Sequence, residues 1–184
     1  INRTKIQYGS SFFYPVSAVG SHVSAVPNHQ TGRITSLNTR GITAMAGTFG
    51  YEMNPALLSE EDKSVIREQM KRYKKYETLI CQGDYYRLSN PFADEYSSWM
   101  FVSEDKRQAL VNVVRLEVQG NMAATYVKLK GLKKEAEYLD HSTGRLYTGV
   151  ALMETGILLP FPKKEYEAYQ IELTEFEKIS GIRQ

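Results

Sequence analysis

Residues 16–26 decide the fold class, and they read Val-Ser-Ala-Val-Gly-Ser-His-Val-Ser-Ala-Val. The run is small, partly β-branched and nearly uncharged, which is typical of a strand buried on both faces of a parallel sheet. A second short strand, Thr-Phe-Gly-Tyr-Glu-Met at 48–53, follows a predicted helix at 37–46. Helices are also predicted at 3–14 and at 59–83. The order helix, strand, helix, strand, helix predicts β/α units.

The helix predicted at 59–83 has the clearest boundaries. Ser59-Glu-Glu-Asp62 has the pattern of a capping box, and Gly83 ends the helix. We expect Glu68 to pair with Arg72, one turn later, and we interpret the basic run at 71–75 as a solvated face rather than a nucleic-acid patch. Cys81 is expected to be an inert, buried thiol. The apolar residues at helical spacing predict one buried face: Val65, Ile66, Met70, Tyr73, Tyr76 and Ile80.

After residue 83 the pattern changes to short alternating runs separated by turn residues. Strands are predicted at 85–88, 98–103, 109–118, 125–129, 136–140 and 166–174, whereas 149–158 fits either a helix or a loop plus a strand. So many short strands indicate an antiparallel β-sandwich. The chain is therefore divided into an α/β domain at 1–83 and an all-β domain at 84–184. Trp99, the single tryptophan, is expected in the sandwich core rather than stacked on a sugar.

The α/β domain is too small to be a finished fold. Two buried parallel strands need sheet neighbours on both sides and helices on both faces. A complete (β/α)8 barrel takes about 250 residues. We therefore expect 1–83 to be the last β/α units of a (β/α)8 barrel, whose other part precedes Ile1, and an isolated chain to associate through its unpaired strands.

Composition excludes several classes of function. The 184 residues carry 23 basic and 21 acidic side chains, and a net charge of +2 gives no electrostatic case for binding nucleic acid or a membrane. No apolar run is long enough for a membrane span. A single cysteine rules out an internal disulfide and a Cys-rich zinc site, and it indicates a reducing, cytoplasmic location. No cofactor and no metal are predicted.

A series of segments resembles, in the same order along the chain, the family 36 glycoside hydrolases, which include the bacterial α-galactosidases. The longest is Gly-Ser-His-Val-Ser-Ala-Val-Pro-Asn-His-Gln-Thr-Gly-Arg at 20–33. The others are Lys-Ile-Gln-Tyr-Gly at 5–9, Phe-Tyr-Pro at 13–15, Thr-Arg-Gly at 39–41, Gly-Thr-Phe-Gly-Tyr-Glu at 47–52, Gly-Asp-Tyr-Tyr-Arg-Leu at 83–88, Trp-Met-Phe-Val-Ser at 99–103 and Leu-Lys-Gly-Leu at 129–132. The last ~50 residues match only loosely.

The resemblance implies an N-terminal β-sandwich, a central (β/α)8 barrel and a C-terminal antiparallel domain. It also implies removal of terminal α-galactose from oligosaccharides such as melibiose and raffinose, with retention of configuration, by an enzyme that forms homo-oligomers. The family's nucleophile is an aspartate on an early barrel strand. Its acid/base aspartate lies in a Ser-Asp-x-Thr-Asp-type segment, and Ile1-Asn2-Arg3 looks like the continuation of that segment.

Both catalytic aspartates are thus expected outside these residues, so no catalytic residue is assigned. A retaining glycosidase needs two carboxyl groups about 5–5.5 Å apart. Without them we expect the chain alone to be inactive. The alternative is a free-standing, non-catalytic carbohydrate-binding β-sandwich module.

The candidate substrate-binding residues lie where the first parallel strand ends. His22, Asn28 and His29 occupy the end of this strand and the loop after it, and barrel active sites form at the C-terminal ends of strands. They either line the sugar pocket or brace the rim of the barrel. Glu52 ends the second strand, and we interpret it as a structural carboxylate paired with Arg33 or Arg40 rather than as an acid/base.

Overall fold

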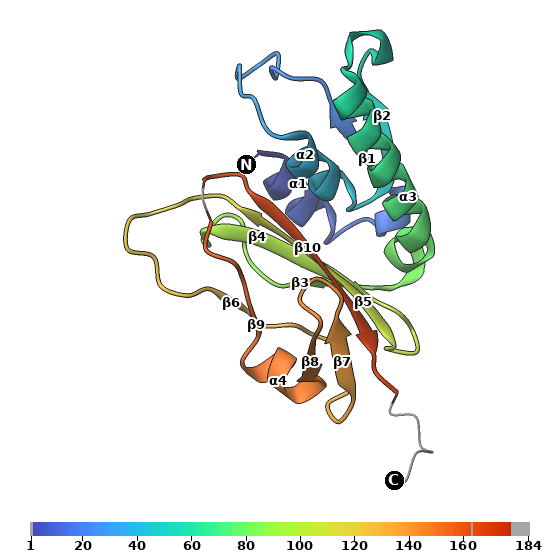
Figure 1. The fold of residues 1–184 in the computed structure, drawn as a ribbon, viewed down its shortest axis with the longest axis vertical. Coiled ribbons are helices and arrows are strands. Elements are labelled where there is room, and N and C mark those ends of the chain that lie inside the picture. The colour runs from blue at the N-terminus through green and yellow to red at the C-terminus, as the bar shows by residue number, and fades with distance from the viewer. Residues whose placement is uncertain (1, 163, 178–184) are drawn as a thin grey trace.

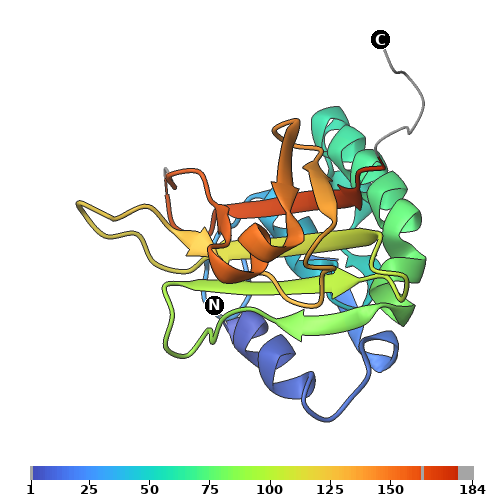
Figure 2. The same cartoon turned by 90° about the horizontal axis from the view of Figure 1, so that it is seen from below.

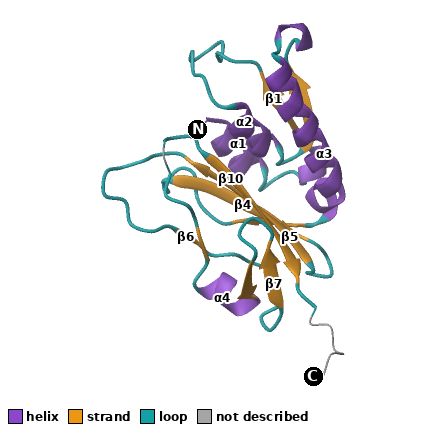
Figure 3. Ribbon diagram, viewed as in Figure 1, coloured by secondary structure: helices purple, strands orange, loops and turns teal. Residues whose placement is uncertain are grey.

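The structure, a computed structural model, describes residues 2–162 and 164–177 (Figures 1 and 3). The first half alternates as predicted: α1 (Asn2–Ser10), β1 (Gly20–Ser24), α2 (Leu37–Ala44), β2 (Thr48–Glu52) and α3 (Glu60–Gln82), with 3-10 turns at Val16–Ala18 and Pro55–Leu57. β1 pairs with β2 in parallel, with Gly20 opposite Thr48 and Ser24 opposite Glu52. The predicted order of helices and strands is confirmed.

Helices cover only one face of this two-stranded sheet. Ser21 and Val23 are buried on the helix side, where Phe49 of β2 stacks on Tyr73 of α3 at 5.0 Å between ring centroids. The opposite face carries Gly20 and His22, which are exposed. The expectation of a strand buried on both faces is therefore wrong for the described residues, because no element among them covers this second face. The strand is also shorter than predicted, since its first residues form a 3-10 turn.

The second half forms one six-stranded antiparallel sheet in the order β3-β4-β5-β10-β7-β8. Its strands are β3 (Asp84–Arg87), β4 (Tyr96–Val102), β5 (Gln108–Arg115), β7 (Glu137–Asp140), β8 (Arg145–Thr148) and β10 (Ala168–Glu175). A small antiparallel pair, β6 (Tyr126–Val127) and β9 (Ile157–Leu158), lies beside a short helix, α4 (Gly149–Glu154). The strand at 145–148 is absent from the sequence prediction, and the ambiguous stretch 149–158 contains both a helix and a strand.

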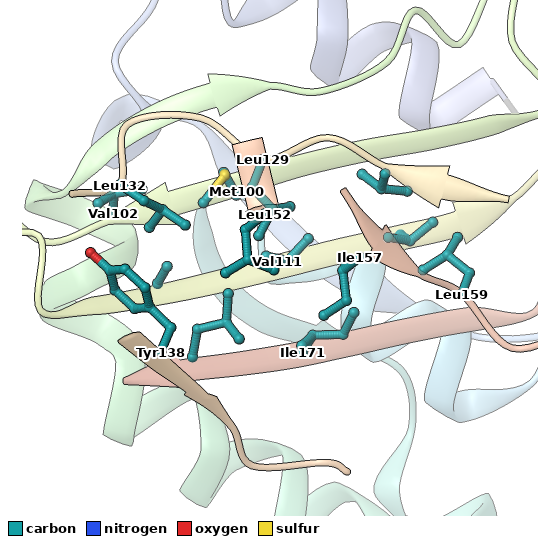
Figure 4. Close-up of a cluster of buried hydrophobic side chains, with 14 residues drawn as sticks. Met100, Val102, Val111, Leu129, Leu132, Tyr138, Leu152, Ile157, Leu159 and Ile171 are labelled. Atoms are coloured by element: carbon teal, nitrogen blue, oxygen red, sulfur yellow. The ribbon is translucent and has the colours of Figure 1, made fainter. Parts of the chain in front are cut away.

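Both faces of the large sheet are buried, and each belongs to a separate core. Figure 1 shows α2 and α3 on one side and α4 on the other, and Figure 2, seen from the α4 side, shows the strands crossing behind that helix. On the α4 side, Val111 and Ile171 of the sheet pack with Leu152 and Ile157 (Figure 4). On the helix side, Trp99, 3% exposed, packs with residues of α2 and α3. The burial of Trp99 is confirmed, but its core is the one that the large sheet shares with α2 and α3 rather than the interior of a sandwich.

The long helix α3 (Glu60–Gln82) has nearly the predicted bounds, but a different face of the helix is buried. The Ser59 hydroxyl accepts a hydrogen bond from the Asp62 amide, which confirms the N-terminal cap. Met70, however, is 54% exposed, and the buried stripe consists of Gln69, Tyr76, Leu79 and Ile80. The stripe is shifted because α3 packs against two surfaces at once, the β1–β2 sheet and the large sheet.

Two smaller expectations on α3 are corrected. Glu68 pairs with Lys71, at 2.8 Å, instead of Arg72. The basic run is exposed as expected, and within it the Lys75 ammonium lies 2.6 Å from Glu172 of β10. Cys81 is half-buried rather than buried, with its sulfur 3.8 Å from the Tyr73 hydroxyl. The end of the predicted all-β domain, 178–184, lies outside the described residues.

Candidate functional site

The side chains of His22 and Glu52 contact each other on the uncovered face of the β1–β2 sheet. Their Nε2 and Oε2 atoms lie 3.0 Å apart, and the side chains are 47% and 72% exposed. The register explains the contact: Ser24 opposes Glu52, so His22 lies two residues back on the same face. Gly50, directly opposite His22, leaves the imidazole uncrowded. The expected pairing of Glu52 with Arg33 or Arg40 is therefore wrong.

Arg3, from the first turn of α1, reaches the middle of β1. Its guanidinium donates to the His22 carbonyl oxygen and, at 3.2 Å, to the Ser21 hydroxyl. Burial lowers the pKa of Arg3, and the nearby Glu52 carboxylate opposes that shift. One helical turn later, Gln7 donates to the Ser21 hydroxyl at 3.3 Å and to the Thr43 carbonyl at 2.8 Å. Polar side chains on one face of α1 thus join it to β1 and α2.

Asn28 holds the loop after β1 in its turn conformation. Its Oδ1 accepts hydrogen bonds from the amides of Gln30 and Thr31, at 3.1 and 3.0 Å, and from the Thr31 hydroxyl at 3.0 Å. An asparagine that caps its own loop in this way is typical of a tight turn. The carbonyl of this side chain is therefore used to fold the loop.

Two arginines fix the ends of this loop. Arg40 of α2 donates to the carbonyls of Ser24 and Thr35, at 2.6 and 3.0 Å, and draws the ends of the loop together. The Arg33 guanidinium lies over the ring of Tyr166, 4.8 Å from its centroid. Since Tyr166 precedes β10, the loop is also attached to the second half of the chain.

These elements enclose an open cleft of about 230 Å³. His22 and Asn28 line it together, whereas His29 is exposed and is absent from the lining. The cleft lining combines apolar surface with hydroxyl, amide and guanidinium groups, which suit the hydroxyls of a ligand. Other lining residues include Asn2, Arg3, Ser24, Thr39, Arg40 and Tyr166.

Sequence reasoning missed Arg3 and Arg40 as members of this cleft, and Gln7 as the residue that attaches α1 to β1 and α2. The signal for Arg3 and Gln7 was their spacing of four residues, which places them on one face of a helix. Nothing in the local sequence identifies Arg40, because both of its acceptors are backbone carbonyls.

Among the residues that the structure describes, His, Cys, Asp and Glu do not gather in groups of three or more that could hold a metal ion. No helix in the described ranges is long and apolar enough to cross a membrane.

Comparison with protein families divides the chain into two consecutive matches. Residues 1–83 match the family described as Melibiase, and residues 96–173 match the family described as the glycosyl hydrolase family 36 C-terminal domain. The second match covers the large antiparallel sheet from β4 to most of β10.

Individual relatives extend the similarity over nearly the whole chain. The chain is 65% identical, over 99% of its length, to the bifunctional alpha-galactosidase/sucrose kinase AgaSK of Mediterraneibacter gnavus, and 44% identical, over 90%, to alpha-galactosidase AgaA of Geobacillus stearothermophilus. It covers 20% and 23% of those proteins, so it spans about a fifth of the length of the curated relatives it matches.

Solved structures show the same relationship. The galactosidase domain of AgaSK superposes with a TM-score of 0.93 at 66% identity, over 95% of this chain and 24% of that one. A variant of AgaA in complex with raffinose superposes with a TM-score of 0.92 at 42% identity, with the same coverage.

Proposed function

The chain belongs to family 36 of the glycoside hydrolases, and we propose that it is the C-terminal part of a retaining α-galactosidase. The two family matches follow one another in the order expected for the end of the catalytic region and the domain after it. The activity and the substrates belong to the complete enzyme, of which this chain supplies about a fifth.

One structural observation carries the assignment of domains. Helices cover one face of the β1–β2 sheet, while the face with His22 and Glu52 is exposed and polar. In a (β/α)8 barrel the helices form the outer ring and the other face points into the barrel. Residues 1–83 accordingly form the last β/α units of that barrel, and 84–184 form the C-terminal antiparallel β-sandwich domain.

The boundary falls at Gly83, where the end of α3 meets β4. A Cβ atom there would lie 2.5 Å from the Leu79 carbonyl oxygen and 2.8 Å from that of Val102. Only glycine permits this close approach of two backbones. The junction between the domains is thus tightly packed rather than a linker.

His22, Asn28 and His29 are the substrate-binding residues of this proposal. His22 has the strongest support, because it lies on the face of β1 that would point into the barrel and lines the cleft. Asn28 also lines the cleft, but its carbonyl folds the loop, so only its amide nitrogen is left to reach a sugar hydroxyl. His29 is supported only by its place in the loop.

The substrates are galacto-oligosaccharides such as melibiose and raffinose. AgaA variants have been solved in complex with raffinose and with stachyose, which supports this class. In a retaining reaction one carboxylate attacks C1 of galactose while a carboxylic acid gives its proton to the glycosidic oxygen as the C1–O bond breaks. Water then attacks C1, gives a proton back to the second group, and releases galactose. Both carboxyl groups lie upstream of this chain.

Two further parts of the proposal concern the whole protein. The use of a single cysteine supports a reducing compartment, so we place the enzyme in the cytoplasm. The uncovered strand edges and the family resemblance support assembly with the other part of the barrel and then into a homo-oligomer. A carbohydrate-binding module is disfavoured, because Trp99 is buried and not available to stack on a sugar.

Turnover of p-nitrophenyl α-galactoside by two purified proteins tests the function. We expect the 184-residue chain to release no nitrophenol above background and the complete enzyme, with its upstream region, to hydrolyse the substrate. Steady turnover by the chain alone would show that it contains its own catalytic groups. A complete enzyme that fails on nitrophenyl galactoside, melibiose and raffinose would overturn the assignment to α-galactosidases.

A further inference from the structure

We propose that Tyr166, from the second half of the chain, is a positioning residue that fixes the loop after β1 at the cleft. The loop comprises residues 25–36, and Tyr166 lies just before β10. The inference rests on the proposed function, because it takes this cleft as the place where the galactoside binds. It gives the C-terminal domain a part in substrate binding, although the candidate binding residues all belong to the first half.

The tip of the loop, residues 28–33, is one closed unit. The Asn28 amide donates to the Arg33 carbonyl at 2.9 Å, and the Gly32 amide donates to the Asn28 carbonyl at 2.8 Å. Because the two ends of the tip are bonded to each other, a contact that holds Arg33 also holds Asn28, which lines the cleft.

The ring of Tyr166 anchors Arg33. The guanidinium carbon lies 4.8 Å from the ring centroid, which is within the range of a cation–π interaction. Both residues line the cleft, and they come from opposite halves of the chain. The loop tip is therefore attached to the second half by a side-chain contact within the cleft itself.

Tyr166 is itself fixed through its backbone. Its amide donates to the carbonyl of Arg115, at the end of β5, at 2.9 Å, and its carbonyl accepts from the Thr39 hydroxyl at 2.6 Å. Thr39 is 4% exposed and lies in the first turn of α2. The φ of Tyr166 is 60°, in the left-handed region, which a tyrosine keeps only where its surroundings enforce it. Glycine would adopt this φ without strain, but it lacks the ring that holds Arg33.

Steady-state kinetics of the complete enzyme on melibiose test the inference. Tyr166→Asn removes the ring, and asparagine tolerates the left-handed region better than most residues. We expect KM to rise about three- to fivefold, as for the loss of one exposed cation–π contact. The kcat should stay unchanged, because the loop binds the substrate equally before and during the reaction. Tyr166→Phe keeps the ring and should keep the wild-type KM.

Tyr126→Asn is the matched control. This tyrosine also belongs to the second half, is 48% exposed on β6, and lies outside the cleft lining. Its replacement should leave KM and kcat unchanged. An unchanged KM in Tyr166→Asn, a loss confined to kcat, or the same rise in Tyr166→Phe would overturn the inference.

A double-mutant cycle with Arg33→Met separates positioning from a direct contact between Tyr166 and the sugar. If Tyr166 acts through Arg33, the KM of Arg33→Met/Tyr166→Asn should equal that of the single variants. Effects of the two changes that multiply would show independent roles and overturn the inference.

Hydrogen exchange of the complete enzyme without substrate gives a second readout. Peptides that cover 25–36 should exchange faster in Tyr166→Asn and at the wild-type rate in Tyr166→Phe, because the first variant releases the loop tip. If Tyr166→Asn fails to fold, Arg33→Met gives the same comparison of KM and exchange. Unchanged exchange in an active enzyme contradicts the positioning role alone. A wild-type enzyme that does not hydrolyse melibiose contradicts the proposed function instead.

Discussion

Trp99 shows how the environment of one residue sets the cost of replacing it. The side chain is 3% exposed, and its indole nitrogen has no hydrogen-bond partner among the described residues. Trp99→Ala is expected to lower the free energy of unfolding by about 3–5 kcal/mol, because it leaves a cavity in the core shared with α2 and α3. Trp99→Phe should cost clearly less, since it keeps an aromatic ring and loses no hydrogen bond. Urea unfolding followed by circular dichroism measures both, and equal small costs would show that Trp99 does not support the core.

Single residues could be predicted where the signal was local. The Ser59 cap and the buried Trp99 follow from a short pattern and from one large apolar side chain. The partner of Glu52 could not be predicted, because it depends on the register between strands separated by 23 residues of loop and helix. Arg33 and Arg40, its expected partners, are instead held by Tyr166 and by backbone carbonyls.

Between elements, the contact of α3 with β10 depends on an ion pair that responds to pH. The Lys75 ammonium lies 2.6 Å from Glu172, and this hydrogen bond raises the pKa of Lys75. Burial pushes the pKa of Glu172 upward, but the hydrogen bond from Lys75 and the neighbouring Tyr76 side chain outweigh burial, so the pKa of Glu172 is lowered. A raised lysine pKa stabilises the fold below its ordinary value of 10.5 and loses that effect at higher pH. A lowered glutamate pKa stabilises the fold above its ordinary value of 4.5 and loses that effect in acid.

Lys75→Met is therefore expected to reduce stability most between those two pH values. The reduction should be about 0.5–1 kcal/mol, because Lys75 is largely exposed and solvent weakens the pair. It should shrink as the pH falls below 4.5 or rises above 10.5. Thermal unfolding across this pH range measures the effect. Lys71→Met is the control, since its partner Glu68 lies on the same exposed helix face. A cost that does not change with pH would contradict the role of the ion pair.

Element types could be predicted more reliably than their packing. The alternation of helices and strands in the first half and most strands of the second half follow from periodicity. Periodicity did not show that β4 and β5 are buried along nearly their whole length, because that depends on helices from the other half of the chain. The rotation of α3, which exposes Met70, has the same cause: the helix packs against two sheets that are distant in sequence.

The two halves of the molecule, before and after Gly83, share one hydrophobic core, whereas one face of the β1–β2 sheet in the first half is exposed. Trp99, Leu110 and Val114 of the large sheet pack with Ile42 and Ile80 of the helices, so neither half closes that core alone. The sequence predicted an unfinished α/β unit, and the exposed face of β1–β2 agrees with that prediction. It did not predict how completely the helices would cover the large sheet, because no local pattern encodes the docking of two units.

The isolated chain is expected to associate with itself. Within the described part of the chain the β1–β2 sheet has two strands, so each presents one edge that no further strand covers. Large apolar side chains in the same half are also exposed, among them Phe13 and Leu57 at 83% and Ile34 at 72%. Sedimentation velocity over a range of concentrations should show a distribution that shifts to larger species for the chain alone. Extension of the chain by its upstream barrel region should give one defined species, because the added strands cover these edges. A chain that stays monomeric at every concentration would show that the two parallel strands need no neighbour, and the assignment of residues 1–83 to a larger barrel would lose its physical basis.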